Sequence, residues 1–218
     1  GGKKFSLNTL DAARNFYRGE AKGSWAPRET LSGRDVLLLG TGPGVAQHRQ
    51  ALEYYICDEK PLVLALNTQS SIDAELIDLR VACHPVRLLA DCEAHLKLPQ
   101  PLITPFSSLP EKIKDYLCNK EILDFGLNVE EGVFKFNDTH CTVPTSLVMA
   151  YAFALVTSGK ANRILMAGFD GYAGEDPRNQ EMNAVILAYK KSKNSIPLVA
   201  ITGTRYDLQQ KSIYGAFI

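Results

Sequence analysis

The feature that most constrains the fold is an apolar run that ends in a glycine-rich turn. Residues 36–39 are all aliphatic, and they lead into Gly40-Thr41-Gly42-Pro43-Gly44 and then into a helical pattern. A strand that is apolar on both faces is typical of a parallel sheet covered by helices on both sides. A glycine turn between such a strand and a helix N-terminus can hold phosphate on free backbone N–H groups. The sequence therefore predicts a unit that handles a nucleotide or a sugar nucleotide.

The rest of the chain continues the alternation of strands and helices. Further strands are predicted at 61–66, 79–83, 102–103, 121–125, 163–167 and 197–201, with helices at 46–56, 85–95, 110–117, 144–158 and 179–191 and an edge strand or flap at 133–136. This order indicates an α/β fold: three-layer, Rossmann-like, with a mainly parallel sheet and helices on both faces.

We expect two parts along the chain. Residues 34–218 form the Rossmann-like nucleotide-binding domain, and residues 1–33 form an N-terminal helix at 8–18 and a polar connector. We interpret 1–33 as an interdomain linker of a longer protein, and Gly1-Gly2 as a cloning remnant.

Composition excludes several classes of function. Of the 218 residues, 24 are Lys or Arg and 24 are Asp or Glu, so no net field attracts nucleic acid or an anionic membrane. No apolar stretch approaches the ~18 residues of a membrane span, and no signal-peptide pattern opens the chain. The five cysteines include no C-x-x-C pair, which argues against a disulfide framework and a structural zinc site. We therefore expect a cytoplasmic protein with no bound metal, no nucleic acid partner and no transmembrane segment.

Polar residues follow several of the predicted strands. In a parallel sheet, ligands bind beyond the carboxyl ends of the strands, so these residues are expected to meet around one ligand. The candidate ligand-binding residues at strand ends are Gly40, Thr41, Gly42, Gly44, Asn67, His84, Arg87 and Asp170.

Each of these candidates also has a reading without a ligand. The glycine turn could be a tight βα turn only, since it lacks both the G-x-G-x-x-G spacing and the G-K-[ST] ending of a P-loop. Asn67 suits a base or ribose edge, or an Asx turn. His84 and Arg87 could bind a carboxylate or phosphate, or cap a helix and pair with Asp91. Asp170 could bind ribose, orient a base or cap a turn.

Thr145 and Ser146 open a helix rich in small residues, predicted at 144–158. His140 lies just before this helix, and a general base placed there would be close to the helix N-terminus. A solvated loop histidine is the alternative. No D-x-D pair is present, which disfavours a metal-bridged glycosyltransferase.

Several segments carry a family resemblance. The glycine turn, Asn67, the Thr145-Ser146 helix start and the run 164–172 resemble, more remotely than the likeness that follows, the bacterial CMP-sialic-acid sialyltransferases and the pterin pyrophosphokinase-like proteins. Segments 78–89, 168–182 and 201–214 resemble the C-terminal domain of HMG-CoA-lyase-like and 4-hydroxy-2-oxovalerate aldolase-like proteins of bacterial surface-polysaccharide clusters.

The resemblance implies a ligand and site residues. Thr41, Gly42 and Asn67 would contact a CMP-type nucleotide or sugar nucleotide, and Thr145 and Ser146 would approach its phosphate or ribose. The sialyltransferase base is a histidine shortly before that helix; this chain has asparagine at the matching position, and His140 three residues later is the candidate base.

Two functions follow from the resemblance. One is a sialyltransferase-like domain in surface-polysaccharide biosynthesis, attached to an N-terminal aldolase-like domain of the same protein. The other is a non-catalytic recognition or assembly domain appended to that aldolase. Pyrophosphoryl transfer to a pterin is a third reading, and assembly into a homo-oligomer stays open.

Overall fold

The chain forms an eight-stranded parallel sheet. Its first five strands run outward in chain order, and its last three lie on the other side of the first strand. The computed structural model describes residues 16–215 and 218, so most of the helix predicted at 8–18 lies outside the described residues. The strand order is β11-β10-β9-β1-β2-β3-β4-β5, and every neighbouring pair is parallel. The strands are β1 (Asp35–Leu39), β2 (Leu62–Leu66), β3 (Leu79–Val81), β4 (Leu102–Thr104), β5 (Ile122–Asp124), β9 (Arg163–Ala167), β10 (Leu198–Ala200) and β11 (Gln209–Gln210).

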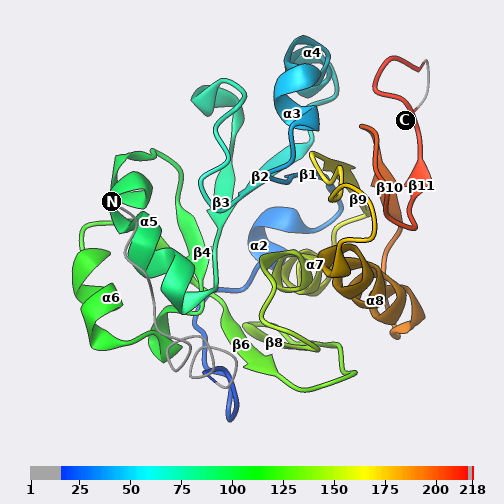
Figure 1. Cartoon of the computed structure of the whole chain (residues 1–218). Coiled ribbons are helices and arrows are strands. Elements are labelled where there is room, and N and C mark those ends of the chain that lie inside the picture. The colour runs from blue at the N-terminus through cyan, green and yellow to red at the C-terminus, as the bar shows by residue number, and fades with distance from the viewer. Residues whose placement is uncertain (1–15, 216–217) are drawn as a thin grey trace.

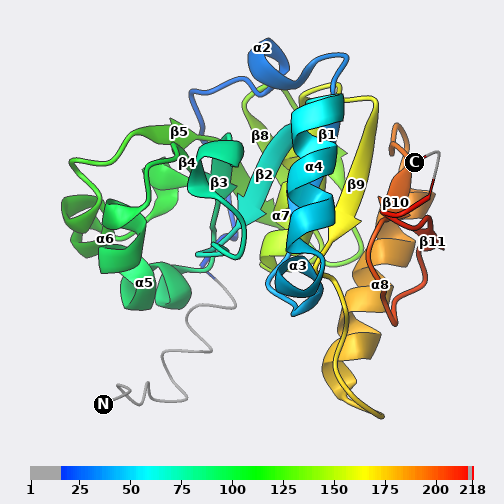
Figure 2. The ribbon, with the colours of Figure 1, turned by 90° about the horizontal axis from the view of Figure 1, so that it is seen from above.

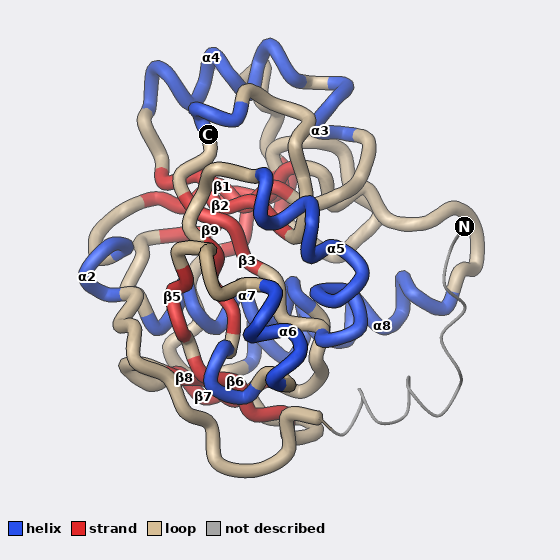
Figure 3. The backbone as a smooth tube through the Cα atoms, turned by 90° about the vertical axis from the view of Figure 1, so that its left-hand side faces the viewer, coloured by secondary structure: helices blue, strands red, loops and turns tan. Residues whose placement is uncertain are grey.

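Helices cover both faces of this sheet, as Figure 1 and Figure 3 show. The short α3 and the longer α4 pack on one face, and α7 and α8 pack on the other. The helices are α2 (Arg28–Leu31), α3 (Gly44–Gln47), α4 (Arg49–Glu59), α5 (Pro85–Lys97), α6 (Glu111–Tyr116), α7 (Val148–Ser158) and α8 (Pro177–Lys191), with 3-10 turns η1 (Ala74–Leu76) and η2 (Phe106–Ser108). The predicted three-layer, Rossmann-like α/β fold is confirmed.

Of a second, small sheet, the sequence predicted only an edge strand or flap at 133–136, where β7 (Lys135–Phe136) forms. The sheet also contains β6 (Gly126–Val129) and β8 (His140–Val143), in the order β6-β8-β7. It packs against α7 on the side away from the large sheet (Figure 3). The helix predicted at 144–158 therefore begins four residues later, at Val148, because the chain first leaves β8.

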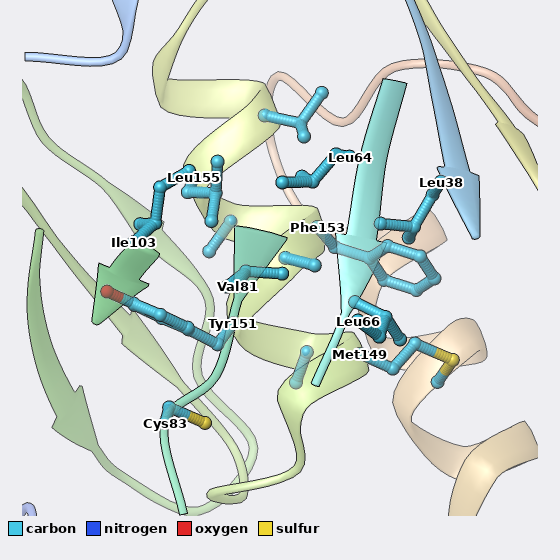
Figure 4. Packing of buried hydrophobic residues seen from close by; sticks show 14 of the residues in the cluster. Leu38, Leu64, Leu66, Val81, Cys83, Ile103, Met149, Tyr151, Phe153 and Leu155 are labelled. Atoms are coloured by element: carbon cyan, nitrogen blue, oxygen red, sulfur yellow. The ribbon is translucent and has the colours of Figure 1, made fainter. Parts of the chain in front are cut away.

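The helix α7 is buried all round because it lies between the two sheets. Every residue from Met149 to Ser158 is buried, which explains the nearly continuous apolar sequence of this helix. In Figure 4, Met149, Phe153 and Leu155 of α7 lie toward the aliphatic side chains of the large sheet. Tyr151 donates a hydrogen bond to the backbone oxygen of Phe125, which ties α7 to the start of the small sheet.

The segment before β1 packs on the same core. Tyr17 and Leu31 are buried in the main hydrophobic cluster, and the backbone N–H groups of Ser24 and Trp25 both donate to the carbonyl of Asp124. The interdomain-linker role of 1–33 stays a prediction. Among the described residues, no helix combines the length and the apolar character that a membrane crossing requires.

Candidate functional site

A cleft of about 700 Å³ lies at the carboxyl ends of the central strands. The chain runs outward from β1 to β5 and then returns to β9 on the other side of β1, so the sheet has a topological switch point between β1 and β9. Figure 2 shows this edge, where α3 and the segment after β9 meet. Ligands of open parallel sheets bind in the crevice at such a point. The volume is that of an ordinary small-molecule site.

The cleft collects polar groups from separate segments over an apolar wall. Of the candidates from the sequence, Thr41, Gly42, Asn67, His84, Arg87, Ser146 and Asp170 line it. Its apolar lining comes from β2, α5, α7, α8 and the segments beside them, and consists of Leu66, Val86, Ala90, Leu147, Val148, Met149, Phe169 and Met182. The exposed Tyr172 forms the rim, and the buried Tyr206 also lines the cleft. The structure therefore brings together most of the residues that the sequence singled out.

Three of the predicted ligand-binding residues lie outside the cleft lining. Gly40 and Gly44 belong to the glycine turn, but they are buried against the segment after β9. Thr145 lines a second pocket, formed with Arg18, Glu130 and Glu131, and its neighbour Ser146 borders both pockets.

The amides of the glycine turn already have acceptors within the protein. The N–H of Gly40 donates to the carbonyl of Ala167, and that of Gly42 donates to the carbonyl of Gly168, both at 2.8 Å. The N–H of Gly44 donates to Oδ1 of Asp170 at 3.1 Å. These three groups are therefore not the free phosphate donors that the sequence predicted.

The glycines are needed because two loops approach closely. A Cβ added at Gly40 would lie 2.6 Å from the carbonyl oxygen of Gly168. Gly168 itself has φ +79°, and a Cβ there would lie 2.5 Å from Val45. Only glycine fits this contact without displacing backbone.

A buried network missed by the sequence analysis supports the loop after β2. The guanidinium of Arg80, in β3, is fully buried and donates to the carbonyls of Asn67 (3.0 Å) and Gln69 (2.6 Å). The same group donates to Oε1 of Gln100 at 3.0 Å. The amide of Gln69 in turn donates to the carbonyl of Gly40, which links this loop to the glycine turn.

This network holds a strained residue at the cleft. Asn67 has φ +50°, a left-handed conformation that non-glycine residues rarely adopt. No carboxylate pairs with Arg80 among the described residues, and burial lowers the pKa of its guanidinium to about 10. A lone arginine inside an apolar strand gave no signal of this role in the sequence.

His84 and Arg87 stand at the N-terminus of α5. His84 is the N-cap residue, as one alternative predicted, but its side chain makes no cap hydrogen bond and lines the cleft instead. Burial and the neighbouring Arg87 guanidinium lower the pKa of His84, which favours its neutral imidazole. Arg87 pairs with Asp91 at 3.0 Å, as one alternative predicted, while it also lines the cleft.

His140 is not brought to the cleft. It lies at the start of β8, where it pairs with Gly126, and it lines neither pocket. Its carbonyl accepts from the N–H of Asn137. His140 is only a few residues from Thr145 and Ser146 in sequence, but the strand β8 lies between them. His140 is therefore not close to the cleft. Among the described residues, no three His, Cys, Asp or Glu side chains form a group that could hold a metal ion.

The rim beside α8 is held in place by its own contacts. The guanidinium of Arg178 lies 3.6 Å from the ring centre of Tyr172, and it forms an ion pair with Asp176 at 2.7 Å. The side chain of Asn179 bonds both the N–H and the carbonyl of Tyr172. Arg178 and Asn179 thus hold the ring of Tyr172, which lines the cleft, in place.

Comparison with known proteins identifies a fold and no family. No protein-family model matches the chain, and no curated protein does. Among solved structures, the chain is similar to the MAf glycosyltransferase from Magnetospirillum magneticum AMB-1, with a TM-score of 0.63 and 10% identity. The match covers 100% of this chain and 40% of that one, so the chain spans two-fifths of the length of that enzyme. At this identity the likeness establishes a shared fold.

Proposed function

We propose that the cleft binds a nucleotide or sugar nucleotide, and that the chain is the donor-binding part of a glycosyltransferase-like protein. The observation that carries this proposal is the convergence of Asn67, His84, Arg87, Ser146 and Asp170 at the switch point of a parallel sheet. The fold shared with a glycosyltransferase supports the reaction class.

The cleft offers different chemistry on its two sides. The N-terminus of α5 presents main-chain N–H groups together with Arg87, a combination that suits an anionic phosphate. The apolar wall and the rim aromatic Tyr172 suit the flat face of a base or the carbon face of a sugar. A nucleotide would therefore span the cleft from α5 to the segment after β9.

His84 takes the place of His140 as our candidate base. Its neutral imidazole lines the cleft and can accept a proton. In the proposed transfer, His84 accepts the proton of an acceptor hydroxyl whose oxygen attacks the anomeric carbon. The bond from that carbon to the phosphate oxygen breaks, and the nucleotide leaves with the electron pair.

The wider context rests on the sequence resemblance alone. Segments 78–89, 168–182 and 201–214 support a role beside an aldolase-like domain in bacterial surface-polysaccharide biosynthesis. In that setting a non-catalytic recognition or assembly role is the second candidate.

A thermal-shift screen with CMP, UDP, ATP and CMP-sialic acid tests ligand binding. A ligand present at 100 times its Kd should add about 2.7 kcal/mol to the unfolding free energy. Catalysis is tested by CMP-sugar hydrolysis in the wild type, in His84→Gln and in the matched variant His140→Gln. We expect CMP-sugar hydrolysis to be lost in His84→Gln and retained in His140→Gln. Binding without hydrolysis would support the recognition role, and no shift with any nucleotide would refute the proposal.

A further inference from the structure

The carboxylate of Asp170 lies inside the glycine turn. A Cβ added at Gly42 would lie 2.4 Å from Oδ1 of Asp170, and a Cβ added at Gly44 would lie 2.9 and 3.1 Å from its two carboxylate oxygens. Oδ1 also accepts the N–H of Gly44, which is the first residue of α3. The protein's own anion thus occupies the place where a glycine turn would hold phosphate.

Asp170 is held in this place by the backbone around it. Its carbonyl accepts the N–H of Arg205 at 3.0 Å. The hydroxyl of Thr202 accepts the N–H of Gly168 at 3.0 Å and would lie 3.2 Å from a Cβ at Gly44. The loops after β9 and β10 therefore hold the backbone of Asp170 beside the turn, and the N–H of Gly44 holds its carboxylate there.

The carboxylate is also available to a ligand. Asp170 lines the cleft and is half-buried. Among the described residues, the N–H of Gly44 is the single donor to its carboxylate, and no cation pairs with it. Oδ2 receives no hydrogen bond from those residues. An ionised carboxyl group can accept about four hydrogen bonds, so acceptor sites remain on Asp170 for the donors of a ligand.

We propose that Asp170 makes the glycine turn a subsite for vicinal hydroxyl groups and excludes phosphate from it. Two hydroxyl groups of a ribose or a sugar can donate to one carboxylate, whereas a phosphate there would meet a like charge. The phosphate end of the ligand is thereby directed across the cleft toward α5 and Arg87. This inference rests on the proposed function and adds the direction in which the ligand lies.

The test compares each of CMP, UMP, AMP and GMP with its 2′-deoxy counterpart by calorimetric titration. We expect the wild type to prefer the ribonucleotide it binds best by roughly tenfold or more, the worth of a charge-assisted hydrogen bond. Asp170→Asn keeps the shape and the acceptor for the N–H of Gly44 but loses the charge. It should bind the two forms equally, and inorganic phosphate should compete more strongly against it than against the wild type.

The outcomes separate the two proposals. Equal binding of ribonucleotides and deoxynucleotides by the wild type, with CMP-sialic acid also unaffected by Asp170→Asn, overturns the hydroxyl subsite and leaves nucleotide binding intact. Equal binding of the two forms together with a roughly tenfold loss of CMP-sialic acid affinity in Asp170→Asn supports the subsite and assigns it to the sugar. No binding of any nucleotide to the wild type overturns both proposals. A preference of the wild type for the ribonucleotide is measured without any variant, and Asp170→Ser replaces Asp170→Asn in the CMP-sialic acid comparison if Asp170→Asn does not fold.

Discussion

Replacing Gly42 by alanine should damage the contact between the glycine turn and the segment after β9. The added methyl carbon would lie 2.4 Å from Oδ1 of Asp170 and 2.6 Å from the carbonyl oxygen of Gly168. Both distances are shorter than 3.0 Å, and Cβ atoms in proteins essentially never approach other atoms so closely. The side chain of Asp170 can rotate away, but the carbonyl of Gly168 belongs to the backbone, so the loop itself must move.

The loss in the free energy of unfolding follows from this backbone shift. Overpacking that displaces backbone costs about 1–3 kcal/mol, and Gly42→Ala also breaks or distorts the hydrogen bond from its N–H to Gly168, worth about 1 kcal/mol. We expect a loss of about 3 kcal/mol in the free energy of unfolding, or roughly 6–12 °C in Tm for a chain of this size.

Gly203→Ala is the matched control. Gly203 lies in the neighbouring loop after β10, and a Cβ there meets nothing within 4 Å. Chemical denaturation of both variants should show Gly203→Ala within about 0.5 kcal/mol of the wild type. A loss below about 1 kcal/mol in Gly42→Ala, or equal losses in both variants, would refute the close-contact reasoning.

Three further predictions concern buried polar groups. Arg80→Lys keeps the charge but loses the planar guanidinium that bonds Asn67 and Gln100. We expect the free energy of unfolding, measured by urea denaturation, to fall by roughly 2 kcal/mol, and nucleotide binding beside Asn67 to weaken. Unchanged stability would contradict a structural role for the Arg80 network. His95 is buried with both ring nitrogens unpartnered among the described residues, and burial and the nearby Arg80 lower its pKa to about 4. In the unfolded chain the imidazole of His95 becomes protonated near pH 6.5, whereas in the folded chain it stays neutral down to about pH 4. The free energy of unfolding should therefore fall by up to about 3 kcal/mol as the pH drops from 6.5 to 4. In a pH series of urea titrations, His95→Leu should remove that part of the fall. Tyr189→Phe removes the hydroxyl that contacts Thr157 at 2.6 Å and should cost about 1–2 kcal/mol, which thermal unfolding would detect; a neutral effect would contradict a structural role for this pair.

The parts of the fold that were predictable are those whose pattern is local. The aliphatic runs of β1, β2 and β9 are buried on both faces, so their sequence alone identifies parallel strands. The residues that follow them, such as Thr41, Asn67 and Asp170, meet at the cleft because parallel strands end at one edge of the sheet.

The features that escaped prediction depend on contacts between distant segments. The strands β6 and β8 mix apolar and polar residues, and they form a sheet because α7 offers an apolar face to cover. Asp170 enters the glycine turn through a contact across 126 residues. His140 is close to Ser146 in sequence, but a strand directs it away from the cleft.

Nucleotide binding in the cleft is the central claim, and a calorimetric titration of a steric variant tests it most directly. Ala90 lines the cleft from an exposed position of α5, so Ala90→Trp should fill the site without disturbing the core. Leu96→Trp places the same side chain on an exposed position of the same helix that does not line the cleft. We expect the wild type and Leu96→Trp to bind the same nucleotide within about twofold, and Ala90→Trp to lose more than about tenfold in affinity. Equal affinity in all three proteins, or no affinity in the wild type, would contradict the account.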